Sequence, residues 1–365
     1  MGDWGNDFWI IRENSNRYKF LNKKSNNESN IINRRGGRIV SADVLKGIGI
    51  ILVVLGHTTH NDELGSWIYH FHMPLFFFLS GVFFSPTIQG LVKRVRQILI
   101  PYLIFGVLSF IYWRFAEMRF RPLPENFDAN MHFFDLFWQT EQFRFNVPLW
   151  FLPCLMIVQS VGTVLFRFIK NQKVLIATVI SWVLIANGIH VSSTAMWVNE
   201  SFYAFPFFAL GYLIGKERYI KMEACLSRKH DWLYSILAII GLITIWLLST
   251  RNDMMSSSYS NGYGAFFLIA LVCIMCLFAL LEKIRSGKII SILTWLGVNS
   301  LIIMCLHEPL KRIIIVVFSK LLGMETEVVR ESIVWSILMS CLIVFLLVPV
   351  CLFINKKCRW VLGKS

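Results

Sequence analysis

Long apolar segments alternate with short polar ones along this chain from residue 42 onward. Each apolar segment is long enough to cross a hydrocarbon core as a helix of about 20 residues. We therefore predict an all-α, polytopic membrane helix bundle with ten spans. The predicted spans are 42–60, 67–86, 98–116, 147–167, 174–193, 197–215, 232–249, 262–281, 291–322 and 332–354. The ninth is too long for one straight crossing and contains Pro309, so we expect a kink, a tilt or an end outside the lipid.

The whole-chain composition agrees with a membrane protein. Apolar residues make up 56% of the 365 residues, and 31 residues are phenylalanine, more than a soluble core needs. The net charge of +14 is divided among short basic runs between the apolar segments. This distribution argues against a nucleic-acid partner, and we expect the lipid bilayer to surround the chain.

The polar N-terminal tail, residues 1–38, holds eight Lys/Arg and four Asp/Glu and lacks the pattern of a signal peptide. We expect a disordered cytoplasmic tail, and Trp4, Phe8 and Trp9 leave a short interfacial segment open as an alternative. The predicted organisation continues with one transmembrane domain over 39–355 and a short basic cytoplasmic tail over 356–365.

The basic residues predict the orientation. Eighteen Lys/Arg lie in the five connections on the side of the N-terminal tail, and five lie in the five opposite connections. The basic connections are 93–97, 167–173, 216–231, 282–288 and 355–365, and the opposite ones are 58–66, 117–146, 190–199, 250–262 and 323–331. Because Lys and Arg are retained in the cytoplasm, we expect both termini to be cytoplasmic in a bacterial-type plasma (inner) membrane.

The first predicted span carries two ionisable residues, Lys46 and His57. They are eleven residues apart, so both side chains project from one helix face, separated by about 16 Å along the axis. Ionisable residues at such depth are costly and usually line a cavity or a pathway. A snorkelling Lys46 paired with Asp43 and a hydrogen-bonded, structural His57 remain open as the alternative.

Further histidines lie around the predicted outer end of the first two spans: His60, His70 and His72. His72 lies near the outer start of the second span, so adjacent antiparallel helices would bring its ring towards that of His57. Pro74 removes one backbone donor beside His72. These histidines also offer metal ligands, but no Asp or Glu in the spans obviously completes a metal site, and we predict none.

Three other polar residues lie in or near the spans. Glu200 follows Trp197 at a predicted interface, where we expect it to be solvated. His307 and Glu308 lie inside the long ninth span beside Pro309, and we expect them to line a cavity.

Several of these segments resemble one known family. Lys46 and His57 fit an Arg/Lys-x10-His pattern inside a D-x-x-[RK]-G opening that also includes Asp43 and Gly47. The remaining matching segments are FHMPLFFFLSG (71–81), KRVRQILIPYL (93–103), PLWFLPCL (148–155), FYAFPFFALGYLIG (202–215) and NSLIIMCLHEPL (299–310). In order and spacing they are similar to those of the acyltransferase family 3 proteins, over residues 39–355. The lysine at position 46 departs from the commoner arginine, and we expect no appended hydrolase-like domain.

The resemblance implies a membrane O-acyltransferase that transfers an acyl group, most often acetyl from acetyl-CoA, to a sugar hydroxyl of a surface or lipid-linked polysaccharide. The expected partners are therefore an acyl-CoA donor, acetyl-CoA or another, and a saccharide acceptor. No bound cofactor is expected.

We assign expected roles to the residues in that scheme. His57 is the expected general base, since a neutral imidazole accepts a hydroxyl proton at neutral pH. His72 is expected to orient or relay, and Lys46 to hold the donor or to stabilise negative charge. The residues expected to bind donor or substrate are Asp43, Lys93, Arg94, Arg96, Trp150, His307 and Glu308.

Two functions of other classes remain as alternatives. Ten spans and buried histidines also suit a transporter or exporter of a sugar or lipid-linked saccharide, although the two halves show no inverted repeat. A glycosyltransferase would need an acidic pair in the outer loop 117–146, where Glu125, Asp128 and Asp135 lack D-x-D spacing.

The predicted orientation is tested by labelling with a membrane-impermeant thiol reagent added outside intact cells. Cys225 and Cys358 lie on the predicted cytoplasmic side and should resist it. Cysteines introduced at Asn130 or Ser257 lie on the predicted outer side and should react. Labelling of Cys358 from outside would invert the orientation.

Overall fold

The computed structural model describes residues 34–35, 38–120, 131–137, 145–188, 197–228, 232–248, 250–281, 284 and 286–364. Predictions for residues 1–33 and for Glu125, Asp128 and Asn130 therefore lie outside the described residues. The elements are β1 (Arg34–Arg35), β2 (Arg38–Ile39), α2 (Val40–Thr58), α3 (Asp62–Tyr69), α4 (His72–Val82), α5 (Ile88–Phe115), η1 (Glu117–Phe120), η2 (Met131–Leu136), η3 (Val147–Trp150), α6 (Phe151–Phe168), α7 (Gln172–Gly188), α8 (Val198–Arg228), α9 (Trp232–Leu248), β3 (Asn252–Asp253), β4 (Ser258–Tyr259), α10 (Tyr263–Leu281), α11 (Gly287–Val298), α12 (Ser300–Leu322), α13 (Thr326–Glu331), α14 (Ile333–Lys357) and η4 (Arg359–Leu362).

The fold is helical, as predicted, with two short antiparallel strand pairs in the described residues. Five helical segments of the described chain are long and apolar enough to cross a membrane, and a bent pair makes a sixth. The five are Val40–Thr58, Ile88–Arg119, Val147–Phe168, Tyr263–Leu281 and Ile333–Lys357. Over their described residues, all ten predicted apolar segments coincide with helices, but the count of ten spans exceeds the five or six that meet these criteria.

The second predicted span, 67–86, is two helices. α3 ends at Tyr69 and α4 begins at His72, with a change of direction at Phe71. Pro74 lies in the first turn of α4, where its missing N–H needs no partner, so it marks the start of a helix. With 11 residues, α4 is about 16 Å long, roughly half a hydrocarbon core.

The ninth predicted span, 291–322, is broken, but at Asn299 and not at Pro309. α11 and α12 meet there at 78°. The Asn299 side-chain amide donates to the Trp295 carbonyl at 2.8 Å, and its carbonyl accepts from the Asn355 amide on α14 at 2.6 Å. These bonds fix the break from two sides, whereas α12 continues through Pro309.

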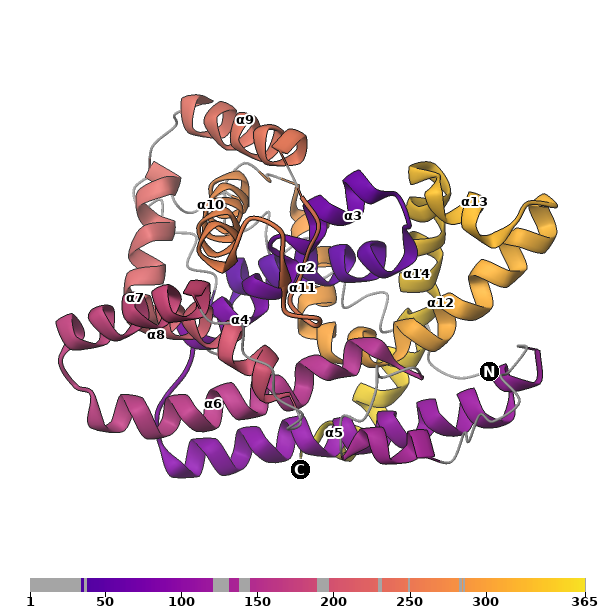
Figure 1. The fold of residues 1–365 in the computed structure, drawn as a ribbon, viewed down its shortest axis with the longest axis horizontal. Helices are drawn as coiled ribbons and strands as arrows, with labels where there is room; N and C mark the ends of the chain where they lie inside the picture. Colours follow the sequence, from indigo (N-terminus) through magenta and orange to yellow (C-terminus); the bar gives the residue numbers. More distant parts are fainter. Residues whose placement is uncertain are drawn as a thin grey trace.

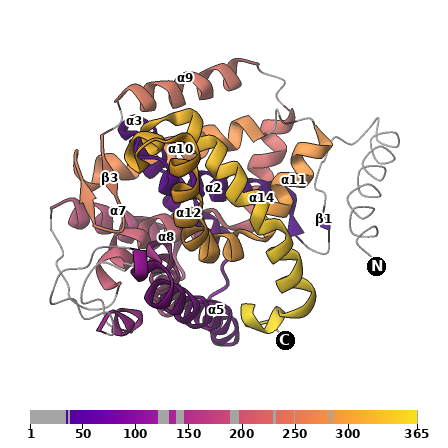
Figure 2. The same ribbon diagram turned by 90° about the vertical axis from the view of Figure 1, so that its right-hand side faces the viewer.

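α2 lies at the centre of the molecule, where it contacts α11, α12 and α14 as well as α4 and α10 (Figures 1 and 2). Two glycines allow the backbones of α2 and α11 to touch. A Cβ added to Gly47 would stand 2.0 Å from the Leu293 carbonyl oxygen, and one added to Gly297 would stand 1.8 Å from that of Asp43. Small residues bring membrane helices together in this way, so the Gly47 side of α2 is closed by packing.

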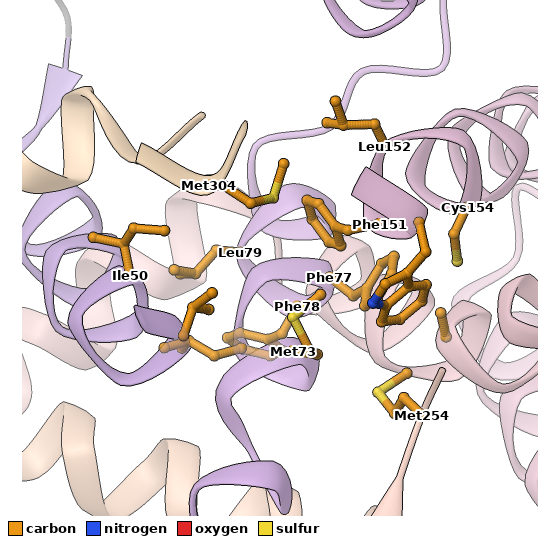
Figure 3. Packing of buried hydrophobic residues seen from close by; sticks show 14 of the residues in the cluster. Ile50, Met73, Phe77, Phe78, Leu79, Phe151, Leu152, Cys154, Met254 and Met304 are labelled. Atoms are coloured by element: carbon orange, nitrogen blue, oxygen red, sulfur yellow. The ribbon is translucent and has the colours of Figure 1, made fainter. Parts of the chain in front are cut away.

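A second glycine pair joins α4 to α8. A Cβ on Gly81 would stand 1.9 Å from the Phe208 carbonyl oxygen, and one on Gly211 would stand 2.1 Å from that of Phe78. On the other side of α4, the rings of Phe77 and Phe151 lie 5.0 Å apart, within the apolar packing that Figure 3 shows. The short helix α4 is therefore held by the protein around it.

Contacts between connecting segments fall within the two predicted sides. On the basic side, Arg218 donates to Gln172 at 2.9 Å, and a Cβ on Gly363 would touch the Arg96 backbone. On the opposite side, Arg251 lies 4.0 Å from Asp62, and His60 hydrogen-bonds to Glu327. Each of these contacts joins two connections of the same predicted side, and the orientation of the chain stays a prediction.

The contact between α2 and α11 predicts that Gly297→Ala destabilises the protein. Its new methyl group must push the two helices apart, which we expect to cost about 1–3 kcal/mol and to lower the Tm by about 5 °C. Thermal unfolding in detergent measures the change. Gly287→Ala is the matched control in the same helix, since nothing lies within 4 Å of its added Cβ. Equal Tm values for the two variants would contradict the proposed close contact.

Candidate active site

A cavity of about 580 Å³ lies at the C-terminal end of α2. Segments far apart in the sequence form its wall: the end of α2, α3, the start of α4, η3, the β3–β4 hairpin, α12 and α13. Its lining residues include His57, Tyr69, His72, Trp150, Met254, Glu308, Lys311 and Arg330. Most of these segments belong to or adjoin the predicted outer connections, so the cavity lies on that side of the protein.

His57 lies in the last turn of α2 and is half-buried at the cavity wall. Its ring is 5.3 Å from the His307 ring and 6.3 Å from the Tyr69 ring, between ring centroids. Among the residues that the structure describes, neither ring nitrogen of His57 has a hydrogen-bond partner. The imidazole therefore keeps a free acceptor for a molecule that enters the cavity.

His72 reaches the same cavity, but Tyr69 lies beside it, with ring centroids 4.9 Å apart. The Nδ1 of His72 donates to the Ile68 carbonyl at 2.8 Å, which assigns the proton of a neutral ring to Nδ1 and leaves Nε2 as an acceptor. The structure thus brings both predicted histidines to one site, with Tyr69 and His307 rather than His72 in ring contact with His57.

α12 supplies a buried ion network to the site. Glu308 forms an ion pair with Lys311, whose Nζ lies 2.7 Å from Oε2, and its Oε1 accepts a hydrogen bond from Arg312 Nε at 3.0 Å. Arg312 also binds both carboxylate oxygens of Glu117, at 2.9 and 3.0 Å. The side chains of Glu308 and Lys311 are only 4% and 9% exposed, so each charge depends on its partner for compensation.

Pro309 leaves one carbonyl of α12 free to bind the segment that precedes η3. Proline has no N–H to donate to the carbonyl four residues earlier, that of Cys305. Asn146 takes the place of that donor, with its amide 2.8 Å from the Cys305 oxygen and 2.8 Å from Ser109 Oγ. The backbone beside His307 and Glu308 is therefore tied to the segment that leads into η3 and Trp150.

The predicted pair Lys46 and Asp43 does not line the cavity. Lys46 Nζ lies 3.6 Å from Asp43 and 5.9 Å from the centre of the Phe83 ring. The position is three turns of α2 away from His57, towards the basic side of the molecule. The structure places Lys46 where a snorkelling cation would lie, and it tests neither role.

The predicted donor-binding cluster lies at the start of α5, also on the basic side. Lys93 and Arg96 are exposed, whereas Arg94 is half-buried. The Arg94 guanidinium lies 4.3 Å from the centre of the Phe84 ring and donates to the Ser85 carbonyl at 3.0 Å. The cluster is thus separated from the cavity by the length of the helices.

The other two histidines of the outer corner have separate partners. His70 Nδ1 hydrogen-bonds to the Ser66 carbonyl at 2.6 Å, and its Nε2 lies 2.9 Å from the Asn252 amide, which ties α3 to the β3–β4 hairpin. His60 lies beyond the end of α2 and hydrogen-bonds to Glu327. Burial lowers the pKa of His60, and the nearby Arg330 charge lowers it further, whereas the hydrogen bond to Glu327 raises it. Within the described ranges, no group of three or more His, Cys, Asp or Glu is placed to hold a metal.

Three residues of the site were not predicted from the sequence: Tyr69, Lys311 and Arg330. Lys311 carried a usable signal, since it is an ionisable residue inside an apolar segment, four positions after His307. Tyr69 and Arg330 carried none, because they are ordinary residues of predicted interfaces. The expectation of a solvated Glu200 was wrong, since its side chain is buried in α8.

A comparison with protein-family models identifies the chain. The model of the acyltransferase domain, acyltransferase family 3, matches residues 39–356. The chain belongs to this family. The match agrees closely with the region 39–355 expected from the motifs, and it favours an enzyme over the exporter hypothesis.

Two curated relatives are similar over part of the chain. The nodulation protein NolL of Mesorhizobium japonicum is 26% identical over 230 residues, which cover 58% of this chain and 56% of the relative. NolL of Sinorhizobium fredii is 28% identical over 227 residues, 56% of each protein. The chain thus spans about half the length of the curated relatives that it matches. No solved structure matches it.

Proposed function

We propose that this acyltransferase transfers an acetyl group from acetyl-CoA to a sugar hydroxyl of a cell-surface or lipid-linked saccharide, with His57 as general base. The observation that carries the proposal is the His57 imidazole at the cavity wall, with no hydrogen-bond partner among the described residues. A base must hold its acceptor nitrogen free for the substrate proton.

The proposed acyl transfer uses the free acceptor nitrogen of the His57 ring. His57 takes the proton of the acceptor hydroxyl as the oxygen attacks the thioester carbonyl and the new C–O bond forms. When the tetrahedral intermediate collapses, the C–S bond breaks, and the imidazolium returns its proton to the leaving thiolate. The nearby Glu308 carboxylate favours the transient imidazolium, and the Lys311 ammonium faces the same cavity as a cation for the oxyanion.

The cavity wall suits a saccharide acceptor. Trp150 and Tyr69 offer aromatic surface, and the polar side chains around them offer donors and acceptors to hydroxyl groups. Because the cavity lies on the predicted outer side, the acceptor enters from that side under this proposal. His72 shares the wall and orients the substrate or the Tyr69 ring.

The acyl donor comes from the opposite side of the membrane under this proposal, because acyl-CoA is cytoplasmic. Its several phosphates require a basic binding site there. Lys93, Arg94 and Arg96 lie together on the predicted cytoplasmic side, and guanidinium groups bind phosphate well. We place the donor head group there, near Lys46 and Asp43, and the acyl end at the cavity. Glu308 belongs to the wall at the reacting end, whereas His307 is buried beside His57, with ring centroids 5.3 Å apart.

Substitution of the base tests the mechanism. Loss of a general base typically lowers the rate by about 10²–10⁴, so we expect that fall in kcat for His57→Ala with a Tm near that of the wild type. His72→Ala should cost less, because it does not itself take the proton. Lys46→Arg should retain much of the activity if charge alone matters, and Lys46→Ala should not. Near-normal acetyl transfer by well-folded His57→Ala protein would refute the mechanism.

The donor site is tested by Arg94→Ala combined with Arg96→Ala. Removing two phosphate-binding cations should raise the KM for acetyl-CoA several-fold and leave the KM for the acceptor unchanged. Arg94 also packs on Phe84, so Arg96→Ala alone is the second variant, with an exposed side chain and a smaller expected rise. An unchanged donor KM in correctly inserted protein would contradict this site.

A further inference from the structure

We propose that Arg330 is a positioning residue that holds His57 at the cavity wall. It lies on α13, in a connection of the predicted outer side, more than 270 residues from His57 in sequence. The inference rests on the proposed role of His57 as base, and it concerns what fixes that ring in space.

The carbonyl groups at the end of α2 need donors from outside the helix. The last four carbonyls of any α-helix lack intrahelical partners, and His57 and Thr58 are the last two residues of α2. Arg330 serves both: its Nη2 donates to the His57 carbonyl at 3.1 Å, and its Nε donates to the Thr58 carbonyl at 3.0 Å. The positive guanidinium also lies at the negative end of the α2 dipole.

Arg330 is itself held in place through its backbone. Its carbonyl accepts from the His60 N–H at 2.9 Å and from Ser336 Oγ on α14 at 3.0 Å. The same carbonyl lies 3.4 Å from Thr59 Oγ1. The contacts therefore run in both directions between α13 and the end of α2, and they join that end to α14 as well.

This anchor matters because the His57 ring has no hydrogen bond of its own among the described residues. Its position depends on the backbone of the last helical turn and on its contacts with His307 and Tyr69. The end of a helix frays when its carbonyls lack partners. Without Arg330, the turn that carries the base loses the two bonds that hold it.

Lysine cannot replace this arginine. One guanidinium reaches two neighbouring carbonyls because its donors stand in a fixed, planar fork, whereas an ammonium is a single point of charge on a flexible stem. A misplacement of about 1 Å can cost about 100-fold in rate. We therefore expect kcat of Arg330→Lys to be about 10- to 100-fold lower, with an unchanged KM for acetyl-CoA.

The matched control is Arg218→Lys. Arg218 also donates to a backbone carbonyl, that of Leu213 at 2.9 Å, but it lies on the basic side and away from the cavity. We expect this variant to keep wild-type kcat.

Chemical rescue adds a second test: guanidinium ions at millimolar concentration should restore part of the kcat of Arg330→Ala, and ammonium ions should not.

Reaction with diethyl pyrocarbonate, followed at the His57 peptide by mass spectrometry, reads the ring position without catalysis. We expect faster modification of His57 in Arg330→Lys and Arg330→Ala than in wild type and in Arg218→Lys. Wild-type kcat together with a wild-type modification rate in Arg330→Lys would overturn the proposal, as would a lower Tm with unchanged kcat per folded molecule. If His57→Ala stays active while the modification rate changes, the anchor stands and the role of His57 as base fails.

Discussion

Charge compensation among buried side chains is the constraint on which the site depends. Glu308, Lys311 and Arg312 lie on one short stretch of α12, and none of them is tolerable there without a partner. Their mutual contacts satisfy part of the demand, and Glu117, in η1 just after α5, supplies a further carboxylate. This requirement brings α12 to α5 and turns the Glu308 face of α12 towards the end of α2. The cavity lies where that compensated stretch meets His57.

The helical pattern was predictable because hydropathy and charge act locally. Within the described residues, each of the ten apolar segments coincides with one helix or with two. The places where helices break were not predictable in the same way. Pro309 is the stronger sequence signal, yet α12 is continuous there because Asn146 supplies the missing donor. Asn299 gave no comparable signal, because the break depends on Asn355, a residue of another helix.

For the site, too, the features that depend on local sequence were predictable and those that depend on distant segments were not. The shared face of Lys46 and His57 follows from helix geometry, and the placement of His72 near His57 follows from adjacent helices in sequence. The contact of His57 with His307 and its anchoring by Arg330 join segments about 250 residues apart or more, which periodicity does not reveal. Which of these residues contact one another depends on how the helices pack. The sequence therefore predicts the candidate residues but not the contacts between them.

The position of Lys46 places a physical condition on the proposed donor route. Lys46 and His57 lie on one stripe of α2, and part of that stripe faces α4: Lys46 lies near Phe83, and a Cβ on Gly49 would stand 3.0 Å from the Phe76 ring. On the adjoining side, Gly47 is in backbone contact with Leu293, which closes the interface with α11. Under the proposed donor route, an acyl arm that follows this stripe from the basic side to His57 would pass between α2 and α4. Side chains change rotamer on faster timescales than helices separate, so rotation of Phe76 is the fastest movement that would open this interface.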